Sequence, residues 1–485
     1  MVKSIVLGTG RSGLAVAGFL LDQGHTVMVS DRSSESDVKA SAQWPEFEAL
    51  QRQYGEKLEW ALGGHPPEIL QGCDQLVISP GVPIHAPFIQ DALQRGVKVT
   101  GEMELAFVRS PKPVIAVTGT NGKSTTCSVL GEMLDEQGIV GGNIGTPLLH
   151  QVQHLSPQVE WVVAEVSSFQ LATVHTFRPR IGILTNISPD HLDHHKTLEE
   201  YRSAKSRMFA QMDENDTAIF CWDDQQAREM MEEALSGTLP EWFDGFPKPA
   251  RKGTPKIRCY SVEEKVENGV SFTIDKNACR WVTRYVEGVA EKLFPWDFDS
   301  LPGKAMMSNG LAAITAALEI GLPLEKIQSG LRRFHPLHYR MELAGVVDGI
   351  SYVNDSKATN IESALASVRA VEGELAVIVG GKDKGVDYSS LARGLKNRNG
   401  RVFLIGEAAE PIQASLEKLG FANMQRSYTM GQALEEATSH LADSGGTVLL
   451  APACSSFDQF KSAEHRGELF NKMVADLERT RSSKG

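Results

Sequence analysis

The stretch VIAVTGTNGKSTT at residues 114–126 decides the fold of this chain. Four apolar residues predict a strand, the glycines that follow predict a tight turn, and KSTT opens a helical stretch. Backbone amides of such a turn and the N-terminus of the next helix bind phosphate groups. Lys123 is expected to reach the terminal phosphates of a nucleotide, and Ser124 to bind Mg²⁺. The first glycine of the usual P-loop would fall on Val117, so the motif is a shorter variant of that loop.

Apolar runs on both sides of this stretch repeat the same pattern of strand, turn and helix. WVVAEVSS (161–168) and IGILTNIS (181–188) are apolar runs that end in polar residues, and SIVLG (4–8) begins a similar unit. Alternating strands and helices predict parallel sheets with crossover helices. Proline-rich and cation-rich junctions separate three such units, which predicts domains at 1–109, 110–336 and 337–485.

Length, charge and cysteine content describe an ordinary globular protein. The chain has 485 residues and a formal net charge of −12, with 49 Lys and Arg against 61 Asp and Glu. This balance argues against nucleic acid as a partner, because phosphate backbones require clustered cations. No apolar stretch is long enough to span a membrane, and six scattered cysteines predict free thiols. We expect a cytoplasmic protein that binds small molecules.

Three polar positions after the central strands are candidates for the metal site. Glu165 ends one apolar run, and His191 lies in NISPDHLDHH after the next. Lys205 lies four residues after Tyr201 on a helical stretch, and by itself it resembles a solvated surface lysine. The neighbouring histidines leave a zinc cluster open as an alternative, although no Cys or His group lies close to them in sequence.

The N-terminal turn GTGRSG (8–13) offers a second phosphate site. It follows a strand, opens a helix and precedes Asp31 at the end of the next strand, as in a dinucleotide-binding fingerprint. A single match of this kind is a weak signal. Arg11 within the turn favours a diphosphate, so a uridine diphosphate group and a dinucleotide both remain open.

The C-terminal unit places several polar loops after apolar runs. VNDSKATN (353–360), GGKDKG (380–385) and LLAPACSSFDQFKSAEHRG (449–467) are expected at one edge of a sheet. Their lysines and hydroxyl groups are suited to a small dicarboxylate, which charge-assisted hydrogen bonds would hold.

Six motifs in order resemble those of the Mur ligases: TGTNGKST, EVSSFQL, NISPDHLDHH, YRSAKSRMF, NDSKATN and APACSSFDQFKSAEHRG. The resemblance covers nearly the whole chain, with few matches in 213–300. It implies an α/β fold of three domains: a Rossmann-like N-terminal domain that binds a UDP-linked substrate, a central P-loop-type ATPase domain and a Rossmann-like C-terminal domain that binds glutamate.

The resemblance also implies a role for each matching residue. Lys123, His191, Lys205 and Glu165 match catalytic positions. The metal ligands would be Ser124, Glu165, His191 and Lys205 as a carbamate, with ATP and two Mg²⁺ ions as expected cofactors. The ATP site would comprise Gly119, Thr120, Asn121, Gly122, Lys123, Ser124, Thr125, Asn309, Arg340 and Asp355. The UDP-substrate site would comprise Arg11, Ser12, Asp31, Arg32, Ser79, Gly81 and Asn143. Glutamate would bind to Lys357, Thr359, Lys384 and Ser456.

Two motifs depart from the family pattern. The helix motif that usually contributes a histidine and two asparagines reads GKAMMSN here, so only Gly303 and Asn309 of the pattern remain, and Asn309 is left for the adenine contacts. Ala463 stands where an aromatic side chain usually packs near the glutamate.

Within the family, NDSKATN and APACSSFDQFK are typical of the member that adds glutamate. The resemblance thus implies an ATP-dependent amide ligase that adds D-glutamate to UDP-N-acetylmuramoyl-L-alanine through an acyl phosphate, in peptidoglycan precursor synthesis, and that acts as a monomer. The alternatives are an L-glutamate-adding relative, a folylpolyglutamate synthase-like ligase, a dinucleotide-dependent oxidoreductase that uses GTGRSG, and a silent nucleotide-binding scaffold.

Overall fold

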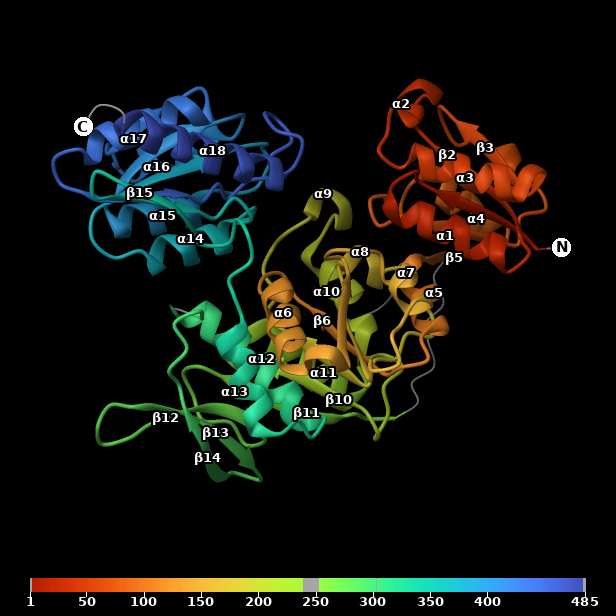
Figure 1. Cartoon of the computed structure of the whole chain (residues 1–485), viewed down its shortest axis with the longest axis horizontal. Coiled ribbons are helices and arrows are strands. Elements are labelled where there is room, and N and C mark those ends of the chain that lie inside the picture. The colour runs from red at the N-terminus through yellow and green to blue at the C-terminus, as the bar shows by residue number, and fades with distance from the viewer. Residues whose placement is uncertain (1, 239–252, 302, 483–485) are drawn as a thin grey trace. The chain divides into compact units, whose positions relative to one another are not determined.

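The protein is an α/β structure with three separate sheets (Figure 1). The computed structural model describes residues 2–238, 253–301 and 303–482. The chain divides into two compact units, Met1–Phe334 and His335–Gly485. The first unit contains two of the sheets and the second unit contains the third.

The first sheet has five parallel strands in the order β3-β2-β1-β4-β5. Its strands are β1 (Lys3–Leu7), β2 (Thr26–Asp31), β3 (Leu58–Leu62), β4 (Gln75–Ile78) and β5 (Lys98–Gly101). Its helices are α1 (Arg11–Asp22), α2 (Glu35–Lys39), α3 (Trp44–Tyr54), α4 (Pro87–Gln94) and α5 (Glu102–Arg109). This order puts the carboxyl ends of β1 and β4 beside each other, where a crevice for a ligand forms in open α/β sheets.

The central sheet has nine strands in the order β14-β13-β12-β11-β10-β9-β6-β8-β7. In this order, the seven strands from β12 to β7 pair in parallel with their neighbours. At the other edge, β13 pairs antiparallel with both β12 and β14. The parallel strands are β6 (Val114–Thr118), β7 (Gly138–Gly142), β8 (Trp161–Glu165), β9 (Ile181–Leu184), β10 (Thr217–Cys221), β11 (Lys256–Ser261) and β12 (Gly269–Ile274). The remaining strands are β13 (Arg280–Val286) and β14 (Val289–Pro295).

Helices surround the parallel part of this sheet. They are α6 (Lys123–Leu134), α7 (Leu148–Gln153), α8 (Ser168–Leu171), α9 (Leu192–His195), α10 (Leu198–Ser206), α11 (Gln225–Ser236), α12 (Gly303–Glu319) and α13 (Leu324–Arg333). Helix α12 begins at Gly303, so it contains the motif GKAMMSN from its first residue. Helix α6 packs against β6 and β8, α12 packs against β9 to β12, and both α12 and α13 contact α6.

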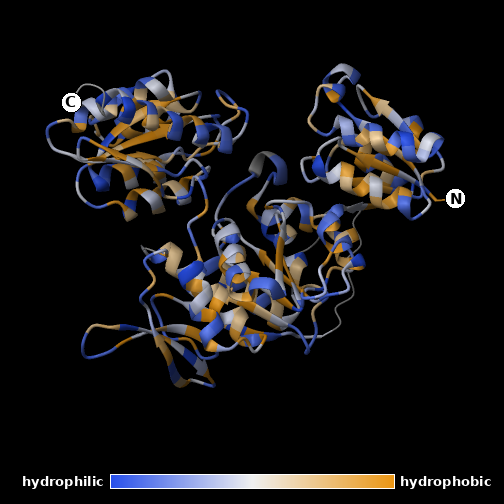
Figure 2. Cartoon of the chain, in the orientation of Figure 1, coloured by the Kyte–Doolittle hydropathy of each residue, from blue (hydrophilic) through white to orange (hydrophobic). Residues whose placement is uncertain are grey.

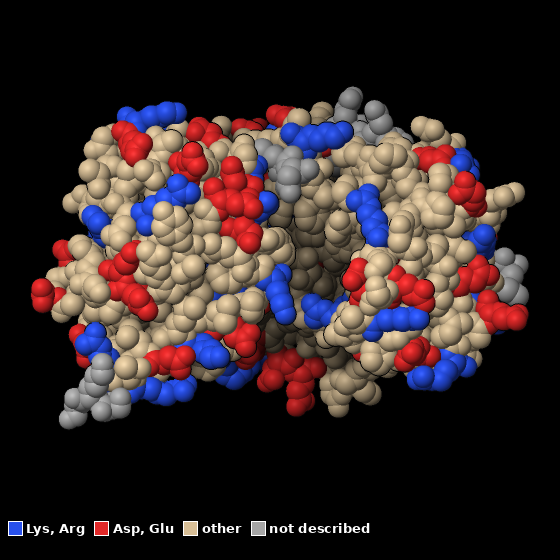
Figure 3. Space-filling view, turned by 90° about the horizontal axis from the view of Figure 1, so that it is seen from above, with Lys and Arg blue, Asp and Glu red and all other residues tan. Residues whose placement is uncertain are grey.

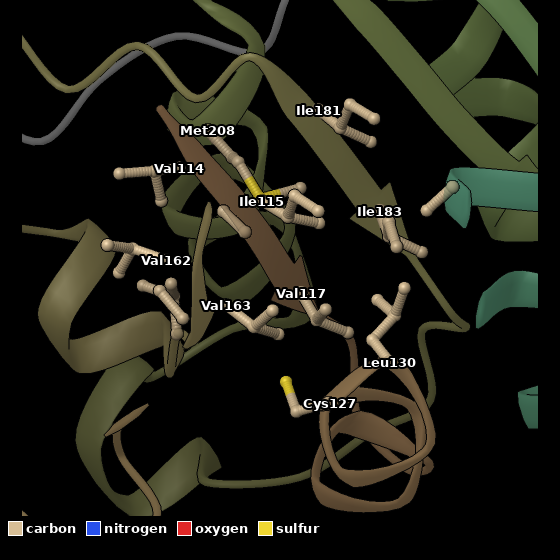
Figure 4. Close-up of a cluster of buried hydrophobic side chains, with 14 of the residues drawn as sticks. Val114, Ile115, Val117, Cys127, Leu130, Val162, Val163, Ile181, Ile183 and Met208 are labelled. Carbon is tan, nitrogen blue, oxygen red and sulfur yellow. The ribbon is translucent and has the colours of Figure 1, made fainter. Parts of the chain in front are cut away.

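The core of the first unit lies around β6. Val114, Ile115 and Val117 are buried between strands β8 and β9 and the helix α6, as Figure 4 shows. All five residues of β6 are buried, which is typical of a parallel strand covered on both faces. Figure 2 shows the same pattern in the other sheets, whose strands are largely hydrophobic. The loop that follows β6 therefore starts from a fully buried strand.

The third sheet has six strands in the order β15-β16-β20-β17-β18-β19. Among its described strands, β15 alone pairs antiparallel, with β16. Its strands are β15 (Glu342–Val347), β16 (Ile350–Asn354), β17 (Leu375–Gly380), β18 (Arg401–Ile405), β19 (Met424–Arg426) and β20 (Gly446–Leu450). Its helices are α14 (Ile361–Ala370), α15 (Ser389–Arg398), α16 (Ala409–Lys418), α17 (Met430–Leu441) and α18 (Ala463–Ser482).

Two surface properties agree with the composition of the chain. On the face shown in Figure 3, Lys and Arg side chains are interspersed with Asp and Glu. Among the residues that the structure describes, no helix combines the length and the apolar content that a membrane span requires.

Candidate functional site

The loop between β6 and α6 is held from the side by the segment that follows β9. The amide of Thr120 donates to the carbonyl of Asn186 at 2.9 Å, and the amide of Asn121 donates to Asn186 Oδ1 at 2.9 Å. Thr185 Oγ1 donates to the carbonyl of Asn121 at 2.6 Å. These bonds fix the path of the loop before any ligand binds, which is the preorganisation that a phosphate site requires.

Two glycines of the loop adopt conformations that side chains rarely adopt. Gly119 has φ of +145° and Gly122 has φ of +87°. A β-carbon at Gly122 would collide with the side-chain oxygen of Asn309, which is buried in α12. Asn309 therefore lies directly beside the loop, as its assignment to the ATP site requires.

Two lysines converge on one carbonyl of this loop. Lys123 Nζ donates to the carbonyl oxygens of Gly119 and Thr120 at 2.9 and 2.8 Å. Lys205 Nζ donates to the same Gly119 carbonyl at 2.9 Å, and its side chain is 1% exposed. Burial lowers the pKa of Lys205 well below its usual value, and the charge of Lys123 lowers it further. Asp190 and Glu165 act in the opposite direction without cancelling this effect.

Glu165 at the end of β8 has one oxygen to offer a ligand. Its Oε1 accepts a hydrogen bond from Asn143 Nδ2 at 2.9 Å. Its Oε2 is buried, and among the described residues it has no hydrogen-bond partner. Such an atom is costly unless a partner satisfies it. A carboxylate oxygen and the hydroxyl of Ser124, in the first turn of α6, are ligands that Mg²⁺ prefers, with nucleotide phosphates completing the shell. The residues present thus fit a magnesium ion.

His191 lies in a group of rings around Phe169. The Phe169 ring contacts those of His191, His194 and His195, with centroid distances of 4.8, 4.3 and 5.3 Å. Nε2 of His195 is 2.9 Å from Ser168 Oγ, and burial lowers the pKa of this histidine to about 3. His191 has a φ of +54° and a half-exposed side chain. His191 is thus accessible at the surface, whereas His195 is fully buried.

Nothing in this part of the chain resembles the zinc cluster considered above. Within residues 2–238, 253–301 and 303–482, no three His, Cys, Asp or Glu side chains gather so that they could hold a metal ion by themselves. A site completed by ATP oxygens needs fewer ligands from the protein.

The turn between β1 and α1 has the close approach expected of a dinucleotide-type loop. A β-carbon at Gly13 would collide with the carbonyl of Gly8, so the helix begins directly against the strand. Asp31 accepts hydrogen bonds from the amide and hydroxyl of Thr9, both at 2.8 Å. Burial acts to raise the pKa of Asp31, but hydrogen bonds from Ser33 and Thr9 outweigh it and hold this pKa below its usual value.

Other residues assigned to the UDP-substrate site lie at the same sheet edge or reach the central sheet. Arg11 Nη1 donates to the carbonyl of Gly145 at 3.0 Å. Asn143, which directly follows β7, is bound to Glu165 through its side chain and its amide. Ser12 lies in α1, Arg32 follows β2, and Ser79 and Gly81 follow β4. The structure thus connects the N-terminal turn to the segment beside Glu165.

In the unit His335–Gly485, the assigned residues follow β16, β17 and β20. Asp355 directly follows β16, is buried, and accepts a hydrogen bond from Ser367. Burial raises its pKa. Lys384 Nζ donates to the carbonyl of Thr359 at 3.2 Å, and Lys357 pairs with Glu464.

Two further assigned residues belong to this unit. Ser456 is 1% exposed and follows β20. Arg340 precedes β15, and its charge acts to lower the pKa of Asp355. The residues of this unit therefore gather at the carboxyl edge of the third sheet, whereas the ATP-loop, metal and UDP-substrate residues belong to the first unit.

Three residues of these sites lay outside the sequence-based assignment. Tyr201 OH is 3.1 Å from Thr120 Oγ1, and Lys205 Nζ lies 4.5 Å from the centre of the same tyrosine ring. Asn186 holds the phosphate loop. Arg466 is fully buried and donates to the carbonyls of Ser356 and Cys454 at 2.9 and 3.2 Å. For Tyr201, the sequence offered one signal, which was its position four residues before Lys205 on the same helical stretch.

Family models match the chain in three consecutive parts. These are the Mur ligase MurD-like N-terminal domain at residues 2–101, the Mur ligase middle domain at 117–317 and the Mur ligase glutamate ligase domain at 339–454. These ranges contain the N-terminal turn, the phosphate loop and most of the polar loops of the third sheet.

Curated relatives match along the whole length. The UDP-N-acetylmuramoylalanine--D-glutamate ligase of Pelotomaculum thermopropionicum is 36% identical over 98% of both chains. The protein of the same name from Koribacter versatilis is 37% identical over 98% of this chain and 97% of its own. Among solved structures, UDP-N-acetylmuramate-alanine ligase MurC of Thermotoga maritima matches with a TM-score of 0.56 at 19% identity, over the whole of both chains, which shows a shared fold. The chain belongs to the Mur ligase family.

Proposed function

We propose that the protein is an ATP-dependent ligase that joins D-glutamate to UDP-N-acetylmuramoyl-L-alanine in peptidoglycan precursor synthesis. The observation that carries this proposal is the convergence of Lys123 and Lys205 on the Gly119 carbonyl, beside a buried carboxylate with an unsatisfied oxygen. The full-length similarity to ligases of that name supports the choice of substrates.

The reaction requires activation because a carboxylate is a poor electrophile. An oxygen of the alanine carboxylate attacks the γ-phosphorus of ATP, the bond to the bridging oxygen breaks, and ADP leaves. The amine nitrogen of D-glutamate then attacks the carbonyl carbon of the acyl phosphate. The C–N bond forms, inorganic phosphate leaves with the electron pair of the broken C–O bond, and the nitrogen loses a proton.

The phosphate loop contributes by positioning and by charge. Backbone amides at the start of α6 and the ammonium of Lys123 would hold the β- and γ-phosphates of ATP. The bonds of Asn186 and Thr185 keep the loop in place, so little reorganisation accompanies binding. Asn309 beside Gly122 would contact the nucleotide on its other side.

Ser124, Glu165 and His191 would hold magnesium, with Lys205 as a fourth ligand once it is carbamylated. Bound Mg²⁺ neutralises the charge that develops on the transferred phosphoryl group. We propose two ions, one beside Ser124 and Glu165 and one beside His191.

The environment of Lys205 favours a carbamate. Burial and the charge of Lys123 favour the neutral amine, which is the form that reacts with CO₂. Its nitrogen forms a bond to the carbon of CO₂ and releases a proton. The carbamate that results is an anion, whereas the ammonium form of Lys205 would repel Lys123. That anion could also serve the metal site.

The two remaining substrates would bind at the carboxyl edges of the other sheets. We assign the uridine diphosphate to the turn at 8–13 with Asp31, and the alanine end of the acceptor to Asn143 beside Glu165. D-glutamate would bind to Lys357, Thr359, Lys384 and Ser456, and Arg340 and Asp355 would contact ATP. We further propose a monomeric enzyme of the cytoplasm, because ATP is available there.

A ligase assay with both glutamate enantiomers tests this function. Purified protein is incubated with Mg²⁺, ATP and UDP-N-acetylmuramoyl-L-alanine, with D-glutamate in one series and L-glutamate in the other. We expect ADP, phosphate and the extended nucleotide in equal amounts, and only with D-glutamate. Product with L-glutamate alone would reassign the substrate, and absence of phosphate release with all three substrates would overturn the proposal.

A further inference from the structure

Helix α5 begins with two buried carboxylates. Glu102 is 3% exposed and Glu104 is 2% exposed. The helix directly follows β5 of the first sheet and leads to β6 of the central sheet. Buried acidic side chains are rare unless they are paired, so each of them requires a partner that explains it.

The partner of Glu102 is the start of α7. Its Oε1 accepts a hydrogen bond from the amide of Leu149 at 2.6 Å. The first amides of a helix have no partner within the helix, and Pro147 at the N-cap of α7 provides no side-chain cap. Glu102 thus supplies from another helix the cap that α7 lacks. Its Oε2 is buried and has no hydrogen-bond partner in the part of the chain that the structure describes.

The segment 143–147, between β7 and α7, is anchored at both ends. At its start, the amide and the side chain of Asn143 donate to the backbone carbonyl and the carboxylate of Glu165, both at 2.9 Å. In the middle, the carbonyl of Gly145 accepts a hydrogen bond from Arg11. At its end, the segment enters the helix that Glu102 caps.

We infer that Glu102 is a positioning residue for the UDP-linked substrate, and that it acts by fixing the segment 143–147. This inference rests on the proposed function, which assigns Arg11 and Asn143 to that substrate. Without the cap, the start of α7 is free to shift, and the Gly145 carbonyl and Asn143 shift with it. The ATP loop and the glutamate residues have their own anchors, and Glu165 is held in β8 by its pairing with β6 and β7, so these sites should be unaffected.

Glu104 offers a matched control in the same helix. It is equally buried, and its oxygens accept hydrogen bonds from the amides of His175 and Thr176 at 3.0 and 2.8 Å. This segment contains no residue assigned to a substrate. Glu104→Ala therefore removes a similar buried carboxylate from the same helix without touching the segment 143–147.

Steady-state kinetics of the full chain test the inference. We expect Glu102→Ala to raise KM for UDP-N-acetylmuramoyl-L-alanine about tenfold, since the loss of one buried hydrogen bond corresponds to about this factor. KM for ATP and D-glutamate should change by less than about twofold. Glu102→Gln retains an acceptor oxygen, so its KM for the nucleotide sugar should rise only about threefold. Glu104→Ala should leave all three KM values within about twofold.

Hydrogen exchange of the amides provides a readout that does not depend on activity. In Glu102→Ala and Glu102→Gln, the amide of Leu149 should exchange faster than in the wild-type protein, whereas in Glu104→Ala it should not. Faster exchange without a selective rise in KM, or an equal rise in all three KM values, would overturn the inference. If Glu102→Ala does not fold, the KM values and the amide exchange of Glu102→Gln test the inference by the same criteria.

The same measurements separate this inference from the proposed function. If the wild-type protein forms no product from the three substrates, the proposed function fails. If it forms product and Glu102→Ala has an unchanged KM for the nucleotide sugar, only the positioning role fails.

Discussion

Lys123 and Lys205 donate hydrogen bonds to the same acceptor, the carbonyl oxygen of Gly119, each at 2.9 Å. Two ammonium groups on one oxygen repel each other, and the repulsion is strong where water is absent. Lys123 belongs to the phosphate loop, whereas Lys205 is buried in α10. Lys205 is therefore the lysine that loses its proton more readily, because burial and the charge of Lys123 both lower its pKa.

Removal of the Lys205 amine should slow catalysis strongly. We expect Lys205→Ala to lower kcat at least about a hundredfold, because the proposed carbamate contributes charge at the site of phosphoryl transfer. Protein equilibrated with ¹³C-bicarbonate should show a carbamate carbon signal that Lys205→Ala lacks. Loss of less than about tenfold in kcat would contradict this role, and a signal that persists in the variant would place the modification elsewhere.

The sequence predicts the parts of the site that are local along the chain. The order of strand, glycines and Lys-Ser identifies the loop at 119–124, and Glu165 follows from its position at the end of an apolar run. Contacts that join distant segments leave no such local pattern. Asn186 holds Asn121 across 65 residues, and Arg466 reaches Ser356 across 110.

The parallel strands of the fold also have a local signal in the sequence. Continuous apolar runs predict the parallel strands, because both faces of such strands are buried. The strands β12, β13 and β14 carry exposed residues and charges, and β14 is mostly exposed. The addition of these strands to the sheet, with β13 and β14 antiparallel, therefore had no clear signal in 213–300, and residues 239–252 of that stretch lie outside the described structure.

Substitution of Glu165 should weaken magnesium binding more than it weakens the fold. In Glu165→Gln the buried Oε2 is replaced by an amide or a neutral oxygen, so the site loses the charge that a divalent ion requires. We expect the Mg²⁺ concentration for half-maximal activity to rise at least about tenfold. Mg²⁺-dependent binding of a non-hydrolysable ATP analogue, measured by calorimetry, checks this without turnover.

Asn143→Ala serves as a control for that substitution. It removes the neighbour of Glu165 Oε1 but keeps the carboxylate. Its Mg²⁺ requirement should remain closer to that of the wild-type protein than the requirement of Glu165→Gln. The reverse order would show that Glu165 acts through Asn143 rather than through a metal ion.

Two glycines with similar backbone conformations allow the effect of backbone strain to be distinguished from that of a steric clash with a neighbouring side chain. Gly122 and Gly321 have φ of +87° and +76°. A β-carbon meets Asn309 at Gly122 but open space at Gly321. Both alanine variants should lose about 1 kcal/mol from the left-handed backbone. Only Gly122→Ala should also lose ATP binding, by at least about tenfold in Kd, because the loop must move away from Asn309. Equal ATP affinity of the two variants would contradict this account of the loop.

Glu102 should make the stability of the first unit depend on pH. Burial raises the pKa of this carboxyl from 4.5 to about 7, and the amides of Leu149 and Leu148 only partly oppose it. Between these values the folded protein binds more protons at this site than the unfolded chain does. The contribution of Glu102 to stability therefore falls as the pH rises from 4.5 to 7 and is constant above that range.

Glutamine does not titrate, so Glu102→Gln should gain stability relative to the wild-type protein across this window, by up to about 3 kcal/mol. The difference in Tm between the variant and the wild-type protein, measured by calorimetry in matched buffers, should thus be more positive at pH 8 than at pH 5. An identical Tm difference at pH 5 and pH 8 would contradict this prediction. It would mean that Glu102 is ionised in the folded protein throughout this range, because a cationic or donor partner stabilises the charge of its buried oxygen.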